Sequence, residues 1–393
     1  KINFIMSVIY SIGILFFSNC VSSNITGQNN IQVTILLVIA VISSTILRMC
    51  SIYSRMENNI KLYIFQSVSI TIIEKVLIIC SYAIGAKYFN AILLISLGYL
   101  LVATIMIMIN RNSIFISTKN VPKETVKAIF KFSVPYLPVL LLSWLNNSIP
   151  QLFLKQFLNY SAIGIYSNAV TIANILTILQ TGFTTYWNPF SYENYKTNGE
   201  KLKKVHKIIT FLIIMLALCV VLGQDIIYLL LGDAYRESKK FFAFLLFTPV
   251  CNTIADTTGV GIVLSKKSYL NIITFICNTL VNVIICIALI PVIGIAGAAI
   301  AAGTSAIVML IVRTLFGNKY YKINDRYNYI IISIISLYVV ALWNLYCPVN
   351  YLKYIVASIF IIVNLCVYRK EIKYLYKYLI SIMKSYSERK KIV

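Results

Sequence analysis

Apolar stretches long enough to cross a lipid bilayer recur along the whole chain of 393 residues. A spanning α-helix needs about 20 consecutive, mostly apolar residues, because hydrocarbon offers its backbone no water to bond. Hydrophobic residues make up 59% of the sequence and charged residues only 12%, whereas soluble domains carry about 25% charged residues. The sequence therefore predicts an all-α, multi-pass membrane protein. Twelve spans are predicted, at roughly residues 2–18, 31–53, 62–84, 90–109, 132–154, 163–187, 208–223, 241–264, 269–290, 294–316, 328–346 and 351–368.

Positive charge is spread unevenly over the loops between these spans. The chain has 35 Lys and Arg against 12 Asp and Glu, a net charge of +23. Most of these cations fall in alternate loops and in the C-terminal tail. Because cytoplasmic loops collect Lys and Arg, we expect the basic side and the C-terminus to be cytoplasmic. The charge is then explained without nucleic acid as a partner.

Cysteine and histidine give no pattern of a metal or cofactor site. The nine cysteines are scattered singly and no pair has CxxC spacing, so they are interpreted as buried apolar residues. The only histidine, His206, lies among lysines and is expected to be solvated. We therefore predict no metal and no cofactor.

Polar residues recur on one face of several predicted spans. In the span that ends near residue 154, they recur at every fourth position, at Ser143, Asn147, Gln151 and Lys155. Span 241–264 has the same spacing at Thr248, Asn252 and Asp256. If residues 164–190 form one continuous helix, a further stripe lies within about 80° and leaves Gln180 outside it. Its members are Tyr166, Asn174, Thr177, Thr181, Thr184 and Asn188.

Charged residues also lie deep in two predicted spans. One of these spans contains Asp256. The other contains Glu74 and Lys75, about two helical turns beyond Gln66. A charge at such depth costs about 2.5 kcal/mol or more, so it is expected to face a cavity or a partner. Coinciding polar faces on several helices favour a cavity, although polar residues also simply hold spans together. Arg48 and Arg313, near span ends, are expected to extend to the membrane surface.

A further stretch, "LIPVIGIAGAAIAAGTSAIV" (289–308), has small residues at every fourth position. Such spacing allows the backbones of two spans to approach closely. We interpret this stretch as a packing surface and assign it no chemistry.

Three segments of the chain resemble a known family. The stretch "IPVIGIAGAAIAAGTS" is similar to a motif of the Wzx-like polysaccharide flippases of the MOP exporter superfamily. The segment "KFSVPYLPVLLLSWLNNSIPQLFLKQFLNYSAIGIYSNAVTIANILTILQTGF" resembles their seventh and eighth helices, and "GVGIVLSKKS" the end of their tenth. One departure is that Pro150-Gln151 stands where relatives often carry an Asp-Arg-like charged pair.

The resemblance implies fourteen helices in two six-helix lobes, with both ends cytoplasmic. Twelve predicted spans then imply that the first two helices are missing from this sequence. The expected divisions are residues 1–116 (four helices left of the first lobe), 117–317 (second lobe), 318–368 (a C-terminal helix pair) and 369–393 (a basic tail). The tail is also typical of a helix lying on the anionic inner leaflet, with a solvated tail as the alternative.

The resemblance also implies translocation of undecaprenyl-pyrophosphate-linked oligosaccharide across the bacterial cytoplasmic membrane by alternating access. Membrane lipids, and possible polysaccharide polymerase and glycosyltransferase partners, follow from it; a functional monomer is the default. Asp256 and Glu74 are the candidates for coupling to protons or another cation. The candidate substrate-cavity residues are Lys75, Asn147, Gln151, Lys155, Asn174, Thr177, Thr181 and Asn252.

Other functions stay open at this point. A MATE-type drug or cation antiporter would favour acidic groups in a more apolar cavity, and a lipid II flippase would differ only in cargo. A membrane polymerase or glycosyltransferase would need a sizeable external loop with catalytic groups, and the predicted loops are short. We therefore expect a transporter and not an enzyme.

Overall fold

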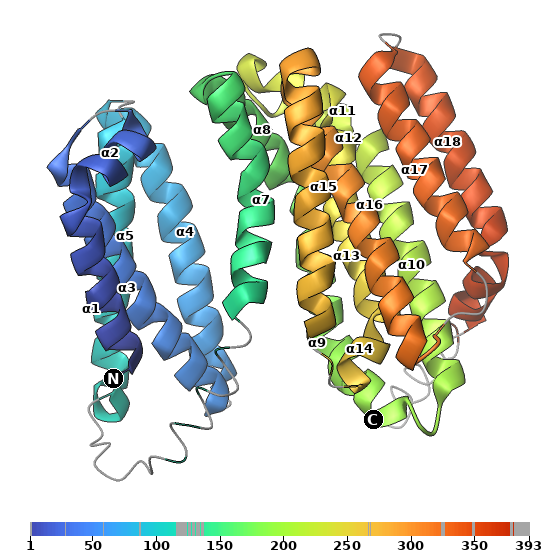
Figure 1. Ribbon diagram of the computed structural model, residues 1–393, viewed down its shortest axis with the longest axis horizontal. Helices are drawn as coiled ribbons and strands as arrows, with labels where there is room; N and C mark the ends of the chain where they lie inside the picture. Colours follow the sequence, from blue (N-terminus) through green and yellow to red (C-terminus); the bar gives the residue numbers. More distant parts are fainter. Residues whose placement is uncertain are drawn as a thin grey trace, which may run out of the picture. The chain divides into compact units, whose positions relative to one another are not determined.

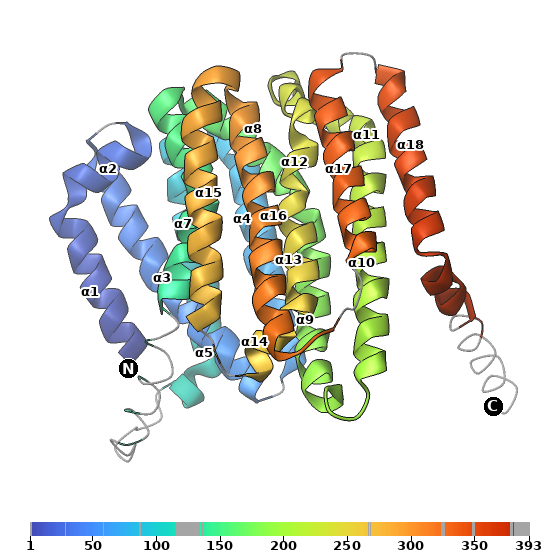
Figure 2. The same cartoon turned by 45° about the vertical axis from the view of Figure 1, so that its right-hand side comes forward.

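The computed structural model describes residues 2–27, 29–57, 59–85, 88–114, 124, 127, 130, 134, 137–265, 267, 269–323, 327–347, 350–377 and 380. These residues form helices and their connections, with no strand among them. The chain divides into two compact units, Lys1–Lys123 and Glu124–Val393. Within each unit the long helices run side by side (Figures 1 and 2). The C-terminal helix pair expected at 318–368 belongs to the second unit.

Unit 1 is built on the packing of α5 against α3 and α4. Leu47 and Cys50 of α3 meet Val102, Ala103 and Met106 of α5 in its buried core. The helices of this unit are α1 (Ile2–Phe16), α2 (Ser18–Thr26), α3 (Ile31–Met56), α4 (Ile60–Ile84) and α5 (Tyr88–Ile114).

Unit 2 holds the largest buried core, which runs from α7 to α18. Its first half consists of α7 (Leu137–Phe157), α8 (Tyr160–Ala173), α9 (Ile175–Asn194), α10 (Gly199–Leu222), α11 (Gln224–Leu229) and the 3-10 helix η2 (Asp233–Lys240). Its second half consists of α12 (Phe242–Leu245), α13 (Phe247–Thr258), α14 (Val260–Leu264), α15 (Tyr269–Ile293), α16 (Ile295–Tyr320), α17 (Asn328–Tyr346) and α18 (Asn350–Val367).

Eight of the described helices are long and apolar enough to cross a membrane, or up to 12 spans if each bent helix pair counts as one. The prediction of an all-α protein with about twelve spans is therefore confirmed. Residues 164–190, taken as one straight helix in the sequence analysis, are instead two helices that bend by 43° at Asn174. The polar stripe was predicted for one straight helix, which these residues do not form.

Unit 2 has two recognisable ends. The α9–α10 and α16–α17 connections lie at one of them, together with the start of α15. Lysines lie in or close to these connections, at Lys196, Lys201, Lys203, Lys204, Lys267, Lys319 and Lys322. We call this end of unit 2 the basic end. Asp256 and Arg313 lie toward the basic end of their helices, whereas Gly294, between α15 and α16, lies at the opposite end.

Small residues let three helices of unit 2 meet at backbone distance. The predicted packing stretch does this at Gly297, where an added Cβ would lie 2.6 Å from the Leu289 main chain of α15. Gly261 and Gly317 do the same between α14 and α16: a Cβ on Gly261 would lie 2.0 Å from the carbonyl oxygen of Gly317. Since the carbonyl oxygen belongs to the backbone and the position of a Cβ is fixed by its own backbone, no side-chain rotation could relieve that overlap. These contacts hold α16, and with it Arg313, against the α13–α14 junction.

Replacing Gly261 with alanine is expected to destabilise unit 2, because α14 and α16 would have to separate. Overpacking of this kind costs about 1–3 kcal/mol, so Gly261→Ala should melt several degrees below the unchanged protein in detergent. Gly164→Ala is the matched control, since nothing lies within 4 Å of an added Cβ in α8; alanine there should be neutral or slightly stabilising. Equal melting of the two variants would contradict this packing.

Candidate functional site

A polar cavity of about 520 Å³ lies inside unit 2, between α7, α8, α9, α13, α15 and α16. Its lining is unusually rich in amides for a group of membrane-spanning helices, and hydroxyl groups such as those of Ser143 and Thr248 add to them. The amide side chains that line it are Asn146, Asn147, Gln151, Asn174, Gln180, Asn252, Asn278 and Asn282. On α16 the wall is made of Ala302, Ala306 and Met309, so the small residues of the packing stretch also leave room for the cavity.

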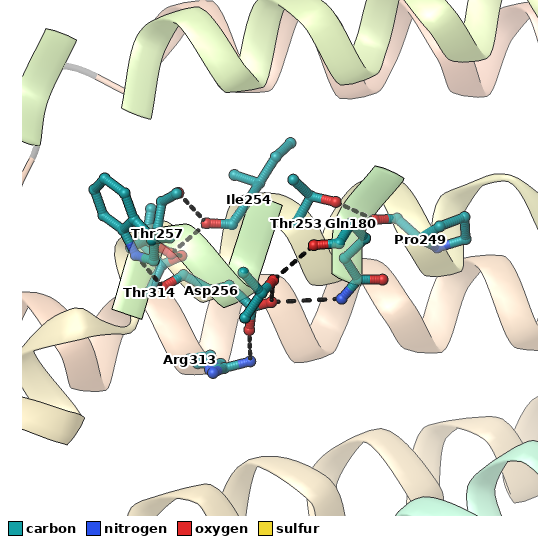
Figure 3. A network of polar contacts seen from close by, with 11 residues as sticks. Gln180, Pro249, Thr253, Ile254, Asp256, Thr257, Arg313 and Thr314 are labelled. Atoms are coloured by element: carbon teal, nitrogen blue, oxygen red, sulfur yellow. Dashed lines mark hydrogen bonds and ion pairs between the residues drawn. The ribbon is translucent and has the colours of Figure 1, made fainter. Parts of the chain in front are cut away.

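One ion pair lies at the end of this cavity nearer the basic end. The Arg313 guanidinium of α16 lies 2.9 Å from Asp256 Oδ1 of α13. The second carboxylate oxygen, Oδ2, accepts hydrogen bonds from the Thr184 hydroxyl at 2.9 Å and the Gln180 amide at 3.4 Å, both on α9 (Figure 3). The Asp256 and Arg313 side chains are only 14% and 20% exposed. Three helices are thus joined at one carboxylate.

The expectation that Arg313 extends to the membrane surface is wrong. Its side chain turns to the cavity because Asp256 lies there and because Gly259 leaves space: a Cβ on Gly259 would lie 2.8 Å from Arg313 Nε. That Nε has no hydrogen-bond partner among the residues that the structure describes. Arg313 therefore keeps donor capacity that Asp256 does not use.

The helix break beside Asp256 is supported from two sides. Helix α13 ends at Thr258 and α14 begins at Val260. The Trp187 indole N–H of α9 donates to the main-chain oxygen of Asp256 at 3.2 Å. On the opposite side of α13, the His206 ring of α10 lies 2.7 Å from the Thr257 hydroxyl. His206 is fully buried, so the expectation that it is solvated is wrong; it packs α10 against α13.

Pro150 creates a second polar contact, at the middle of α7. Proline has no N–H, so the carbonyl oxygen four residues earlier, on Asn146, loses its helical partner. The Asn282 side chain of α15 replaces it, since its Nδ2 lies 3.0 Å from both the main-chain oxygen and Oδ1 of Asn146. Gln151, beside the proline, donates to Ser167 of α8 at 3.2 Å. Gln151 thus places a neutral amide between α7 and α8.

Five of the predicted site residues come together at this cavity: Asn147, Gln151, Asn174, Asn252 and Asp256. Thr177 and Thr181 are not part of the lining; the Thr181 hydroxyl bonds back to the Thr177 main chain at 2.8 Å. Lys155 lies at the far end of α7, with its ammonium group 5.5 Å from the Tyr160 ring centre.

Glu74 and Lys75 belong to unit 1 and pair with one another at 3.3 Å. The Tyr99 hydroxyl of α5 also donates to Glu74, at 3.4 Å. The Lys75 side chain is 64% exposed on the surface of its own unit. It is therefore a cation that the packing within unit 1 leaves accessible.

The predicted set missed Arg313, Gln180, Asn146, Asn278 and Asn282. Asn278 and Asn282 lie four residues apart on α15, a spacing that the analysis of the other spans could have detected. Gln180 likewise lies four residues before Thr184 on α9, and both side chains bond Asp256. No group of three or more His, Cys, Asp or Glu residues that could hold a metal ion occurs within the described part of the chain.

The apolar helices around an internal polar cavity define a multi-pass membrane protein. Solved structures show which fold this is. The lipid II flippase MurJ in an inward closed conformation has a TM-score of 0.65 at 16% identity, over 94% of this chain and 82% of that chain. An outward-facing multidrug resistance MATE family transporter of the MOP superfamily has a TM-score of 0.53 at 17% identity, over 81% of this chain and 76% of that chain. The fold is therefore that of the MOP exporters.

Sequence comparison gives the family. A family model described as polysaccharide biosynthesis protein matches residues 1–240, more than half of the chain. The chain belongs to this family of polysaccharide biosynthesis proteins. No curated protein sequence matches it significantly.

The ion pair should show energetic coupling in a double-mutant cycle. Asp256→Asn leaves a largely buried guanidinium without its counter-ion and should destabilise the protein. The double variant Asp256→Asn/Arg313→Gln should be destabilised less than Asp256→Asn alone, because it contains no unpaired charge. We expect a coupling energy on the order of 1–3 kcal/mol from thermal unfolding of the single and double variants in detergent.

The matched control is the exposed pair Arg236–Asp233 in η2, whose side chains are 52% and 87% exposed. Its coupling should be below about 1 kcal/mol, as for other surface pairs. A coupling between Asp256 and Arg313 no larger than this would show that the cavity pair is solvated and structurally unimportant.

Proposed function

We propose that this protein is a flippase that moves undecaprenyl-pyrophosphate-linked oligosaccharide across the bacterial cytoplasmic membrane. The observation that carries the proposal is the cavity of unit 2, whose lining combines many amides with Arg313, an arginine whose Nε has no hydrogen-bond partner among the described residues. Membership of the polysaccharide biosynthesis family and the likeness to a lipid II flippase support it.

The cavity matches the chemistry of such a substrate. A diphosphate needs cationic donors to offset the loss of its hydration, and arginine bonds phosphate oxygens through two parallel N–H groups. Sugars need many hydrogen-bond partners, which amides and hydroxyls provide as both donors and acceptors. The lipid chain can stay in the bilayer and needs no polar lining.

Asp256 and Arg313 also supply a means of coupling. In the structure the Arg313 guanidinium is paired with Asp256. A bound diphosphate would compete with Asp256 for the guanidinium, which would link substrate binding to the carboxylate that is the first candidate for coupling to protons or another cation. Substrate and ion would thus act on one pair of side chains. Glu74, paired with Lys75 in unit 1, is the second candidate for ion coupling.

The remaining expectations follow from this function. The basic end of unit 2 faces the cytoplasm under the positive-inside tendency, so the C-terminus is cytoplasmic and substrate enters near Arg313. Alternating access comes from movement of the two lobes of the fold. Partners are lipid-linked oligosaccharide, membrane lipids, and the polymerase and glycosyltransferases of the same pathway, with the monomer as the functional unit.

Two related functions compete with this one. Lipid II translocation differs only in the attached glycan and uses the same diphosphate chemistry. A MATE-type antiporter of organic cations would need unpaired acidic groups to bind its substrates, whereas the Asp256 carboxylate is already held by an arginine. The ion pair therefore favours an anionic substrate over a cationic one.

Translocation should depend on the cavity charges. With a fluorescent undecaprenyl-pyrophosphate-linked sugar in proteoliposomes, Arg313→Gln should lower the rate of flipping at least about tenfold, because a hydrogen bond to a charged group contributes about 1.5–3 kcal/mol. Asp256→Asn and Lys75→Ala should abolish translocation while insertion into the membrane stays intact.

Arg236→Gln, a loss of one arginine in the exposed helix η2, is the matched control and should flip at the unchanged rate. Unimpaired translocation by all three cavity and unit 1 variants would overturn the proposal. Transport of an organic cation in exchange for protons, with no activity on the lipid diphosphate, would favour the antiporter.

A further inference from the structure

We propose that α7 and α15 form a separate carbohydrate subsite in the cavity, in which Phe275 packs against a sugar ring and Asn278 bonds its hydroxyls. This inference rests on the proposed function and divides the cavity between two tasks. Arg313, in place of its contact with Asp256, binds the diphosphate, and the α7–α15 wall distinguishes one sugar from another.

The wall is built on one face of α15. Phe275, Asn278 and Asn282 are spaced by three and four residues, so their side chains project in the same direction. At 1.5 Å per residue the first and last of them are separated by about 10 Å along the helix. The stripe therefore presents one aromatic ring and two amides in line along the cavity.

Asn282 fixes the position of this wall. Its amide N–H₂ group is used on Asn146, whose main-chain oxygen Pro150 has left without a helical partner. The contact joins α15 to α7 and makes Asn282 a positioning residue. It also leaves Asn147, on the next position of α7, exposed at the cavity.

Asn278 has hydrogen-bonding capacity that the protein does not use. It is 4% exposed, lines the cavity, and its Oδ1 has no hydrogen-bond partner among the described residues. A buried polar atom without a partner costs about 1–3 kcal/mol, a cost that a ligand hydroxyl would remove. Such an unpaired amide is a strong means of selection, because ligands that lack the matching group leave it unsatisfied.

Phe275 supplies the feature that separates a sugar from water or a small ion. Its ring is partly exposed at the cavity, beside the two amides. One face of a pyranose is made of C–H groups, so it can bury apolar area against an aromatic ring while its hydroxyls bond the flanking amides. A volume of about 520 Å³ lies within the range of sites that hold small organic ligands, about 300–1,000 Å³.

The subsite is chemically distinct from the ion pair. Charged groups of the cavity lie on α13 and α16, whereas the α7 and α15 residues that line it are neutral. Removing an amide of α15 should therefore change the contribution of the sugar to binding without changing the contribution of the diphosphate. The subsite can therefore be tested separately from the binding of the diphosphate.

The probes are undecaprenyl diphosphate and the same lipid carrying a single hexose, N-acetylhexosamine or deoxyhexose, bound to the purified full chain in detergent. The unchanged protein should bind at least one sugar-carrying probe more tightly than the sugar-free lipid. Asn278→Leu and Phe275→Leu should each reduce this sugar-dependent gain about fivefold to tenfold, while affinity for the sugar-free lipid stays within about twofold. Arg313→Gln should instead weaken binding of every probe.

Thr279→Val is the matched control, since Thr279 is buried on the same helix, has an unpartnered hydroxyl among the described residues, and does not line the cavity. It should keep the full sugar-dependent gain. The subsite is refuted if no sugar improves binding, or if the gain survives in both Asn278→Leu and Phe275→Leu. The proposed function fails separately, if the sugar-free lipid does not bind or binds equally well to Arg313→Gln.

Discussion

The ion pair between Asp256 and Arg313 is the interaction on which the cavity of unit 2 depends. A single charge inside a membrane-spanning helix costs about 2.5–3.5 kcal/mol on insertion scales, so each of these groups needs the other. The pair forms only because glycines let α16 approach the α13–α14 junction, and because α9 brings two donors to the second carboxylate oxygen (Figure 3). Packing and charge are therefore inseparable at this site.

Backbone breaks supply the rest of the polar character. Pro150 removes one helical hydrogen bond from α7, and the bend at Asn174 and the helix break at Gly259 interrupt two further spans. Side-chain amides or an indole compensate the carbonyls of Asn146 and Asp256. Irregular backbone at membrane depth is tolerated where it is buried in protein or lines a water-filled cavity.

The fold and part of the candidate site could be predicted because both depend on the spacing of apolar and polar residues along the chain. Apolar length gave the spans, and the four-residue repeat of Thr248, Asn252 and Asp256 gave one wall of the cavity. The prediction failed for residues whose interaction partner lies on another helix. Arg313 near a helix end is compatible with the membrane surface until the position of Asp256 is known, and His206 among lysines looks solvated until Thr257 is found beside it. Gln180, four residues before Thr184, was left out because its partner Asp256 lies on another helix.

The most direct test of the central claim is whether water reaches the cavity wall. In a chain without its native cysteines, single cysteines would replace Asn252 in the cavity and Ile284, which is 64% exposed on the outer face of α15. A membrane-impermeant thiol reagent should label the cysteine at 252 in membranes, because a hydrated cavity contains it, and should leave the cysteine at 284 unmodified in lipid. Labelling at neither position, in membranes opened to the reagent on both sides, would show that the amides of unit 2 lie in dry helix contacts and would contradict the account.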